Sequence, residues 1–170
     1  MSVEPRVTAP EHIQAHHDLT AFDCSAPDLN DWLRQQALRN EASGASRTYV
    51  ICAERRVVGY YALATGAIAR AAATSKVRRQ MPDPIPVMII GRLAVDVQHQ
   101  GQGLGYGLLR DALLRTLHVA EHAGIRAVLL HAMTAEAKRF YQRAGFRESP
   151  LDPLTLMVAI AEIDRVLAKP

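Results

Sequence analysis

The sequence of 170 residues is poor in cysteine, in aromatic side chains and in long apolar runs. Cys24 and Cys52 are too few and too far apart for a disulfide framework or a cysteine-based zinc site. No apolar stretch approaches the ~20 residues that a membrane-spanning helix needs, and the N-terminal residues contain no apolar signal segment. We therefore expect a cytoplasmic protein that forms one domain over residues 1–170, with a substantial core.

A resident metal ion is also not expected. The seven histidines are scattered, and only the pairs His16–His17 and His118/His122 suggest a site. No acid or cysteine evidently completes either ligand set, so we expect these histidines to be solvated. Cys52 lies in an apolar strand pattern and is expected to be a small buried hydrophobe.

The hydrophobic pattern predicts alternating strands and helices, which indicates an α/β fold with a mixed sheet flanked by helices. Asp28 is the expected N-cap of the first helix, and Gly44, Gly124 and Gly145 are expected to end helices. Residues 70–86 are expected to be irregular because three prolines bar a continuous helix. The expected strands are 6–9, 48–53, 57–69, 87–95, 127–132 and 154–159, and the expected helices are 28–42, 103–123, 134–143 and 160–169.

A glycine-rich loop, Gln-Gly-Gln-Gly-Leu-Gly at residues 100–105, is the most informative segment. It follows the apolar strand pattern of residues 87–95 and opens an amphipathic helix. Glycines allow tight turns that expose backbone N–H groups, and a helix N-terminus adds unpaired donors and the positive end of a dipole. This arrangement predicts an anion site suited to a pyrophosphate. It is not a Walker A loop, and its alternating glycines fit a dinucleotide fingerprint poorly.

The loop resembles the coenzyme A loop of the GNAT N-acetyltransferase superfamily, whose signature Gln/Arg-x-x-Gly-x-Gly/Ala falls on Gln100, Gly103 and Gly105. A second family motif, Phe-Tyr followed after three residues by Gly-Phe, matches residues 140–146. Both motifs occur in the family's order and spacing. The alternative for Tyr141 is a core aromatic at the end of a short helix.

The resemblance implies a GNAT acyltransferase fold, with a mostly antiparallel mixed sheet that splays apart at the coenzyme A site. It implies acetyl-CoA as co-substrate and Tyr141 as general acid for the departing thiolate. The backbone around residues 93–95 would take strand-like hydrogen bonds from the pantetheine arm and offer an oxyanion donor. The residues expected to bind the coenzyme are Leu93, Ala94, Val95, Gln100, Gly101, Gln102, Gly103, Leu104, Gly105 and Phe140.

Two features depart from the family pattern. Many members carry a glutamate base on the central strand, but residues 87–95 contain no carboxylate. An α-amine of pKa ~7.8 is about 14% neutral at pH 7, whereas a lysine amine is about 0.04% neutral, so a site without a base favours an α-amine. Water-relayed proton loss to Asp96 or Glu136 stays open. The sequence His-Ala-Met at residues 131–133 replaces the polar residue, commonly Asn, that many members carry there.

Positively charged residues are concentrated in the segment that leads into the central strand. Residues 70–92 hold five bases and one acid, a local excess of four, while the whole chain has a net charge of +3. Such a cluster can be solvated, or it can grip the phosphates of a polyanion. No aromatic set for stacking on single-stranded RNA is evident. The expected phosphate contacts are Arg78, Arg79 and Arg92.

A narrower resemblance points the same way. Residues 44–50, 84–96 and 149–157 are similar to the GNAT toxins of bacterial type II toxin–antitoxin operons. That similarity implies acetylation of the α-amine of aminoacyl-tRNA, a block of translation, and neutralisation by a ribbon-helix-helix antitoxin. A homodimer is left open, and no membrane partner is expected. The alternatives are a GNAT enzyme that acetylates a small-molecule or protein amine, and a module that binds coenzyme A without turnover.

Overall fold

The computed structural model describes residues 6–168. The chain divides into two compact units. Unit 1 contains residues up to 64 together with 92–112, and unit 2 contains residues 65–91 together with those from 113 onward. The expectation of a single domain over residues 1–170 remains a prediction. Among the helices of residues 6–168, none has the length and apolarity needed to cross a bilayer.

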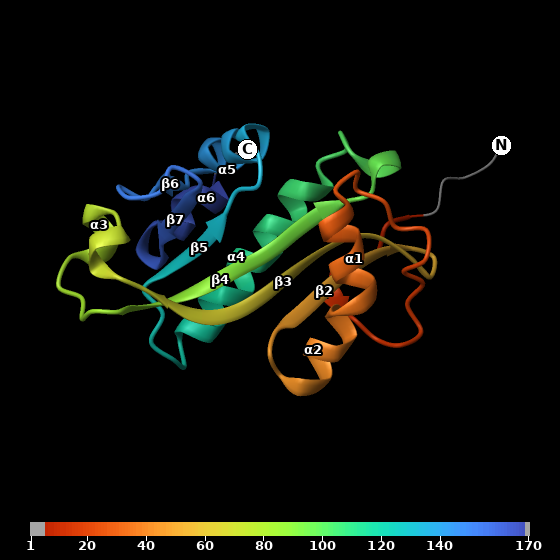
Figure 1. Cartoon of the computed structure of the whole chain (residues 1–170), viewed down its shortest axis with the longest axis horizontal. Coiled ribbons are helices and arrows are strands. Elements are labelled where there is room, and N and C mark those ends of the chain that lie inside the picture. The colour runs from red at the N-terminus through yellow and green to blue at the C-terminus, as the bar shows by residue number, and fades with distance from the viewer. Residues whose placement is uncertain (1–5, 169–170) are drawn as a thin grey trace. The chain divides into compact units, whose positions relative to one another are not determined.

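Three elements run through both units: β3 (Arg56–Ile68), β4 (Ile85–Val95) and α4 (Leu104–Ala120). Figure 1 traces the elements along the chain. Unit 1 also contains β1 (Glu11–His12), α1 (Pro27–Gln35), α2 (Ala37–Ser43), β2 (Arg47–Ala53) and η2 (Val97–His99). Unit 2 also contains η1 (Arg70–Ala72), α3 (Ser75–Arg78), β5 (Ala127–His131), α5 (Ala135–Ala144), β6 (Arg147–Glu148), β7 (Thr155–Ala159), η3 (Ile160–Glu162) and α6 (Ile163–Ala168).

The strands form one mixed sheet in the order β1-β2-β3-β4-β5-β7-β6. β4 and β5 are parallel, while β1–β2, β2–β3, β5–β7 and β6–β7 are antiparallel. The register of β4 with β5 runs from Val87↔Ala127 to Ile90↔Leu130 and does not reach residues 93–95. The predicted mixed α/β fold is confirmed.

Each unit has its own apolar cluster. In unit 1, Phe22, Leu33, Val50 and Tyr60 are buried together, and α1 and α2 lie beside β2 (Figure 1). In unit 2, β5 and β7 are buried throughout except at His131, because their alternate residues face two covered sides. Ile85, Ala127 and Met157 belong to the cluster of that unit.

The first helix differs from its predicted bounds. It begins at Pro27, with Ala26 at the N-cap and no side-chain cap, so the N-cap predicted at Asp28 is wrong. Proline suits a first turn because its φ is already helical and it has no N–H group to satisfy. The helix is also interrupted at Gln36, where φ widens to −116°, and continues as α2. Gly44 ends α2 in the left-handed region, as predicted.

Other boundaries are corrected as well. The strand predicted at 6–9 is reduced to a single bridge between Val7 and Ala53. α4 ends at Ala120, and Gly124 does not adopt the left-handed conformation expected of a helix stop. The segment 70–86, predicted to be irregular, contains the short helix α3. The last predicted helix is η3 followed by α6, and Lys169 lies outside the described residues.

Candidate active site

The glycine loop has the predicted geometry. Gly101 and Gly103 have φ of +80° and +81°, which side chains rarely adopt. Residues 100–103 are exposed, and Gly107 N donates to Gly103 O at 3.0 Å in the first turn of the 17-residue helix α4. An exposed backbone turn therefore lies at the positive end of a long helix, which is the arrangement that binds phosphate groups.

The buried carboxylate of Asp96 holds the start of this loop. Its two oxygens accept hydrogen bonds from Asp23 N at 3.1 Å and Gln98 N at 3.0 Å. The side chain is 2% exposed and caps η2. The role of Asp96 as a water-relayed base remains a prediction, and each of its oxygens already accepts one backbone N–H group. These contacts cap η2, the turn that leads into the glycine loop.

Gln100 joins the loop to the end of β4. Its side-chain Nε2 donates to Val95 O at 2.9 Å. This contact fixes the first residue of the loop against the strand whose residues 93–95 are expected to contact the coenzyme. The glutamine of the family signature therefore links the loop to the strand through its side chain.

Arg92 of β4 lies over an aromatic ring of α1. The guanidinium carbon is 4.5 Å from the centroid of the Trp32 ring. Trp32 stacks on Tyr60, with an interplanar angle of 8° and centroids 5.9 Å apart. The sequence did not reveal this stack, because 59 residues separate Trp32 from Arg92. Whether Arg92 also contacts a nucleic acid remains a prediction.

Tyr141 lies in α5 of unit 2, and both ends of this helix are capped. Thr134 Oγ1 accepts from Ala137 N at 3.0 Å, and Gly145 closes the helix with φ of +118°. A Cβ at Gly145 would lie 2.9 Å from a side-chain carbon of Val166. Glycine at this position of the Gly-Phe motif is therefore required by both the backbone and the packing.

The ring of Tyr141 is packed between two other aromatic rings. Phe140 and Phe146 make edge-on contacts with it, with centroids 5.0 Å and 5.8 Å away. The side chain is 8% exposed, and burial raises the pKa of Tyr141 to about 12. The phenol therefore keeps its proton throughout the physiological pH range and can only donate it.

Arg78 and Arg79 lie at the end of α3, and a third arginine fixes that segment. Arg126 donates from Nε to Val77 O at 3.0 Å and from Nη2 to Lys76 O at 3.0 Å and Arg79 O at 3.3 Å. A guanidinium that binds several terminal carbonyls satisfies acceptors that a helix end leaves unpaired. Sequence reasoning missed Arg126 because nothing local distinguishes it from a surface arginine.

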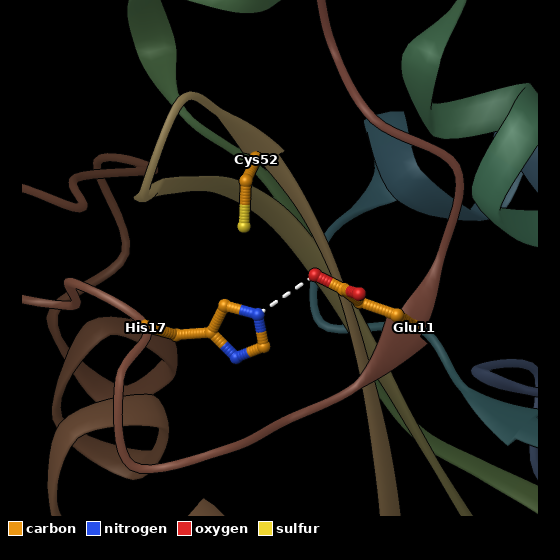
Figure 2. A group of neighbouring side chains, drawn as sticks. All are labelled: Glu11, His17 and Cys52. Atoms are coloured by element: carbon orange, nitrogen blue, oxygen red, sulfur yellow. Dashed lines mark hydrogen bonds and ion pairs between the residues drawn. The ribbon is translucent and has the colours of Figure 1, made fainter.

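One histidine is not solvated as expected. His17 is 6% exposed and approaches Glu11 and Cys52 (Figure 2). Gln14 N donates to His17 Nδ1 at 2.9 Å, so in the neutral ring the proton is on Nε2, which faces Glu11 Oε1 at 2.8 Å. A metal ion would need the lone pair of that protonated nitrogen. This cluster is therefore a hydrogen-bonded clasp, while His16, His118 and His122 are exposed.

Comparison with known proteins identifies the family. The model of the acetyltransferase (GNAT) domain matches residues 44–148. The chain belongs to the GNAT acetyltransferase family. It is thus an enzyme of the acyl-transferring class, and the predicted fold family is confirmed.

Individual relatives of this acetyltransferase agree with the narrower resemblance. The chain is 48% identical over 155 residues to a tRNA-acetylating toxin of Mycobacterium tuberculosis, covering 91% of this chain and 93% of the relative. The structure of AtaT complexed with acetyl-methionyl-tRNAfMet has a TM-score of 0.87 and 30% identity, covering 96% and 100% of the two chains. A tyrosine-to-phenylalanine mutant of the AtaT toxin, bound to the C-terminus of the antitoxin AtaR and to acetyl-CoA, has a TM-score of 0.82 and 28% identity, covering 96% and 99%.

Proposed function

We propose that this acetyltransferase is a toxin that transfers the acetyl group of acetyl-CoA to the α-amine of aminoacyl-tRNA. The observation that carries this proposal is the 48% identity to a tRNA-acetylating toxin over 91% of the chain. Blocking the amine prevents the aminoacyl group from acting as a nucleophile in peptide-bond formation. We further propose that the protein acts in the cytoplasm and is neutralised by a cognate antitoxin of the ribbon-helix-helix class.

The proposed contacts with acetyl-CoA are assigned segment by segment. The turn of Gln100–Gly105 and the N-terminus of α4 offer backbone donors to the pyrophosphate. Residues 93–95 lie beyond the register of β4 with β5, which supports their proposed pairing with the pantetheine arm and the proposed oxyanion donor there. Phe140 is assigned to the coenzyme as well.

The acceptor amine is proposed to arrive neutral. β4 contains no carboxylate, and both oxygens of the neighbouring Asp96 accept hydrogen bonds from backbone N–H groups. An α-amine of pKa ~7.8 supplies enough free base at neutral pH without help, whereas a lysine amine does not. This supports an aminoacyl ester over a protein side chain as the acceptor.

The chemical step then requires one proton to move to sulfur. The amine nitrogen attacks the thioester carbonyl, the carbon–sulfur bond breaks, and Tyr141 gives its phenolic proton to the departing sulfur. A phenol of pKa about 12 does not spontaneously protonate a free thiolate of pKa ~8.5. Transfer therefore accompanies bond breaking, and the phenolate regains a proton from the newly acylated nitrogen. The net result is that the amine proton reaches sulfur by way of Tyr141.

The test is mass spectrometry of aminoacyl-tRNA after incubation with the enzyme and isotope-labelled acetyl-CoA. We expect the label on the α-amine, and none on uncharged tRNA or on tRNA charged with an N-formylated amino acid. The matched control is Tyr141→Phe at equal concentration. If a small polyamine is acetylated while every charged tRNA is left unmodified, the toxin assignment is wrong and a small-amine acetyltransferase replaces it.

A further inference from the structure

A groove of about 890 Å³ lies within unit 2, between α3, the loop that joins β6 to β7, and α6. Five of its lining residues are cationic and two are acidic. The cationic residues are Lys76, Arg78, Arg79, Arg147 and Arg165, and the acidic ones are Glu148 and Glu162. Three separate segments of the sequence thus contribute positive charge to one concave surface.

The two acids of the groove already have partners. Lys76 Nζ is 3.7 Å from Glu162 Oε2, and Lys138 Nζ is 2.5 Å from Glu148 Oε2. Within the part of the chain that the structure describes, the four arginines of the groove have no carboxylate partner. The groove therefore presents four uncompensated guanidinium groups, and an anionic ligand would be attracted to it.

The walls of the groove are held in place by buried contacts. Arg126 fixes the backbone that carries Arg78 and Arg79. On the opposite wall Ser149, which is 4% exposed, donates to Ala72 O at 2.5 Å and accepts from Leu151 N at 3.1 Å. A surface that is ordered before binding loses less conformational freedom when a ligand arrives.

The chemistry of the lining indicates what the ligand is. Guanidinium groups present fork-shaped donors that match phosphate oxygens. Among the described lining residues none is aromatic, so the groove offers phosphate contacts without a stacking platform for bases. Four arginines spread over α3, β6 and α6 suit a chain of phosphates better than a single ion.

We propose that this groove binds the sugar–phosphate backbone of the tRNA substrate, and that Arg147 and Arg165 are phosphate contacts in addition to Arg78 and Arg79. The proposal rests on the function proposed above. It adds two residues, distant in sequence from the basic segment before β4, to the recognition surface.

The experiment compares three double variants in steady-state acetylation of one aminoacyl-tRNA at several salt concentrations. Arg147→Gln with Arg165→Gln tests the proposal, and Arg78→Gln with Arg79→Gln tests the wall formed by α3. Arg39→Gln with Arg55→Gln removes the same charge from exposed positions of unit 1 and is the matched control. Melting temperatures establish that each variant is folded.

The expected result follows from counterion release. Each phosphate contact contributes about 0.7 to 0.9 to the slope of log affinity against log salt, so two lost contacts should make the slope shallower by about 1.4 to 1.8. If the variant and the parent bind equally at about 1 M salt, the same relation makes the KM for tRNA about fifteen- to thirtyfold higher in the variant at about 0.15 M. We expect kcat at saturating tRNA and the Kd for acetyl-CoA to stay at parental values, and the control variant to keep the parental slope.

The remaining outcomes would refute either the proposed groove or the proposed function. An unchanged KM and slope for the Arg147/Arg165 variant, while the parent acetylates tRNA, refutes the groove and leaves the proposed function intact. An equal change in the control variant shows an effect of net charge alone and also refutes it. If the variant keeps parental tRNA kinetics but escapes inhibition by polyglutamate, the groove belongs to an acidic protein segment. Failure of the parent to acetylate any charged tRNA refutes the proposed function itself.

Discussion

The guanidinium group of Arg92 lies over the indole ring of Trp32, with its carbon 4.5 Å from the ring centroid. The ring in turn stacks on Tyr60, whose hydroxyl donates to Leu29 O at 2.7 Å. This column connects α1 to β3 and β4 within unit 1. In the sequence, Arg92 is only one base of a basic cluster. In the structure, its guanidinium group has Trp32 as a defined partner.

A double-mutant cycle tests this contact. We expect Trp32→Leu and Arg92→Gln each to lower the free energy of unfolding. The coupling between them should be about 0.5–1 kcal/mol, the usual range for a partly exposed cation–π pair. Urea denaturation of the four proteins measures it. Additive effects would mean that the ring and the guanidinium are neighbours without a net attraction.

The glycine loop is tested with two isosteric substitutions. Gly103→Asp and Gly103→Asn both enter open space, because no atom lies within 4 Å of a Cβ there, and both residues tolerate left-handed φ better than most. The aspartate adds a negative charge where the pyrophosphate is proposed to bind. Calorimetry should show a sharp loss of acetyl-CoA affinity for Asp and a smaller loss for Asn. Equal affinity of the two variants would argue against an anion site at this turn.

Tyr141→Phe removes one hydroxyl group and keeps the packing of the ring against Phe140 and Phe146. We expect single-turnover acetylation to slow by roughly 10²–10⁴, the usual range for a lost general acid, with unchanged acetyl-CoA affinity. An undiminished rate would return Tyr141 to the role of a core aromatic.

The pH profile gives a separate readout for Tyr141. Its pKa of about 12 means that the phenol stays protonated well above the ordinary tyrosine range. We therefore expect kcat/KM to rise as the α-amine loses its proton near pH ~7.8 and not to fall near pH 10. A descending limb centred near pH 10 would contradict this assignment.

Arg126 is proposed to be a positioning residue that acts through the backbone of α3. In Arg126→Gln, the loss of three carbonyl contacts should loosen the segment that carries Arg78 and Arg79. We expect a several-fold higher KM for tRNA with kcat unchanged at saturation, and partial recovery in Arg126→Lys. Equal changes in KM and kcat, or no recovery with lysine, would indicate a general loss of structure.

Cys52 predicts how stability depends on alkaline pH. Burial raises the pKa of this thiol from 9.0 to about 11. Because the folded-state pKa is the higher one, the contribution of Cys52 to stability is fully present below pH 9 and is lost as pH rises toward 11. The loss is about 2–3 kcal/mol, at 1.36 kcal/mol per pKa unit.

Urea denaturation between pH 8 and pH 10 measures the onset of this effect, roughly half of the full loss. Burial also raises the pKa of the Cys24 thiol, so the parent is compared with a variant that keeps Cys24 and all the tyrosines. The Cys52→Ala variant starts from a lower stability because it leaves a cavity, so the slopes with pH are compared rather than the absolute values. The variant should show a flatter decline above pH 9. Parallel declines would mean that Cys52 does not titrate in this range.

The elements that sequence reasoning placed best are those specified by nearest neighbours. The turn of residues 100–105, the cap at Gly145 and the stop at Gly44 each depend on a glycine that adopts positive φ beside an amphipathic helix. The two GNAT motifs are also local features. One forms a strand–loop–helix and the other a helix end, and each is made of contiguous residues. Boundaries were less accurate where neighbouring signals compete, as at Pro27, which precedes the expected cap at Asp28.

The sequence by itself determined the fold family, the glycine turn assigned to pyrophosphate binding and the tyrosine assigned to catalysis, because local backbone conformation and short motifs specify them. Tertiary structure decided which charges are available for chemistry. It buried the carboxylate of Asp96 among backbone donors, enclosed His17 beside Glu11, and gathered Arg78, Arg147 and Arg165 around one groove. These outcomes depend on side chains that are far apart in the chain. Their solvation and partners are set by packing, and packing is not encoded in any single segment.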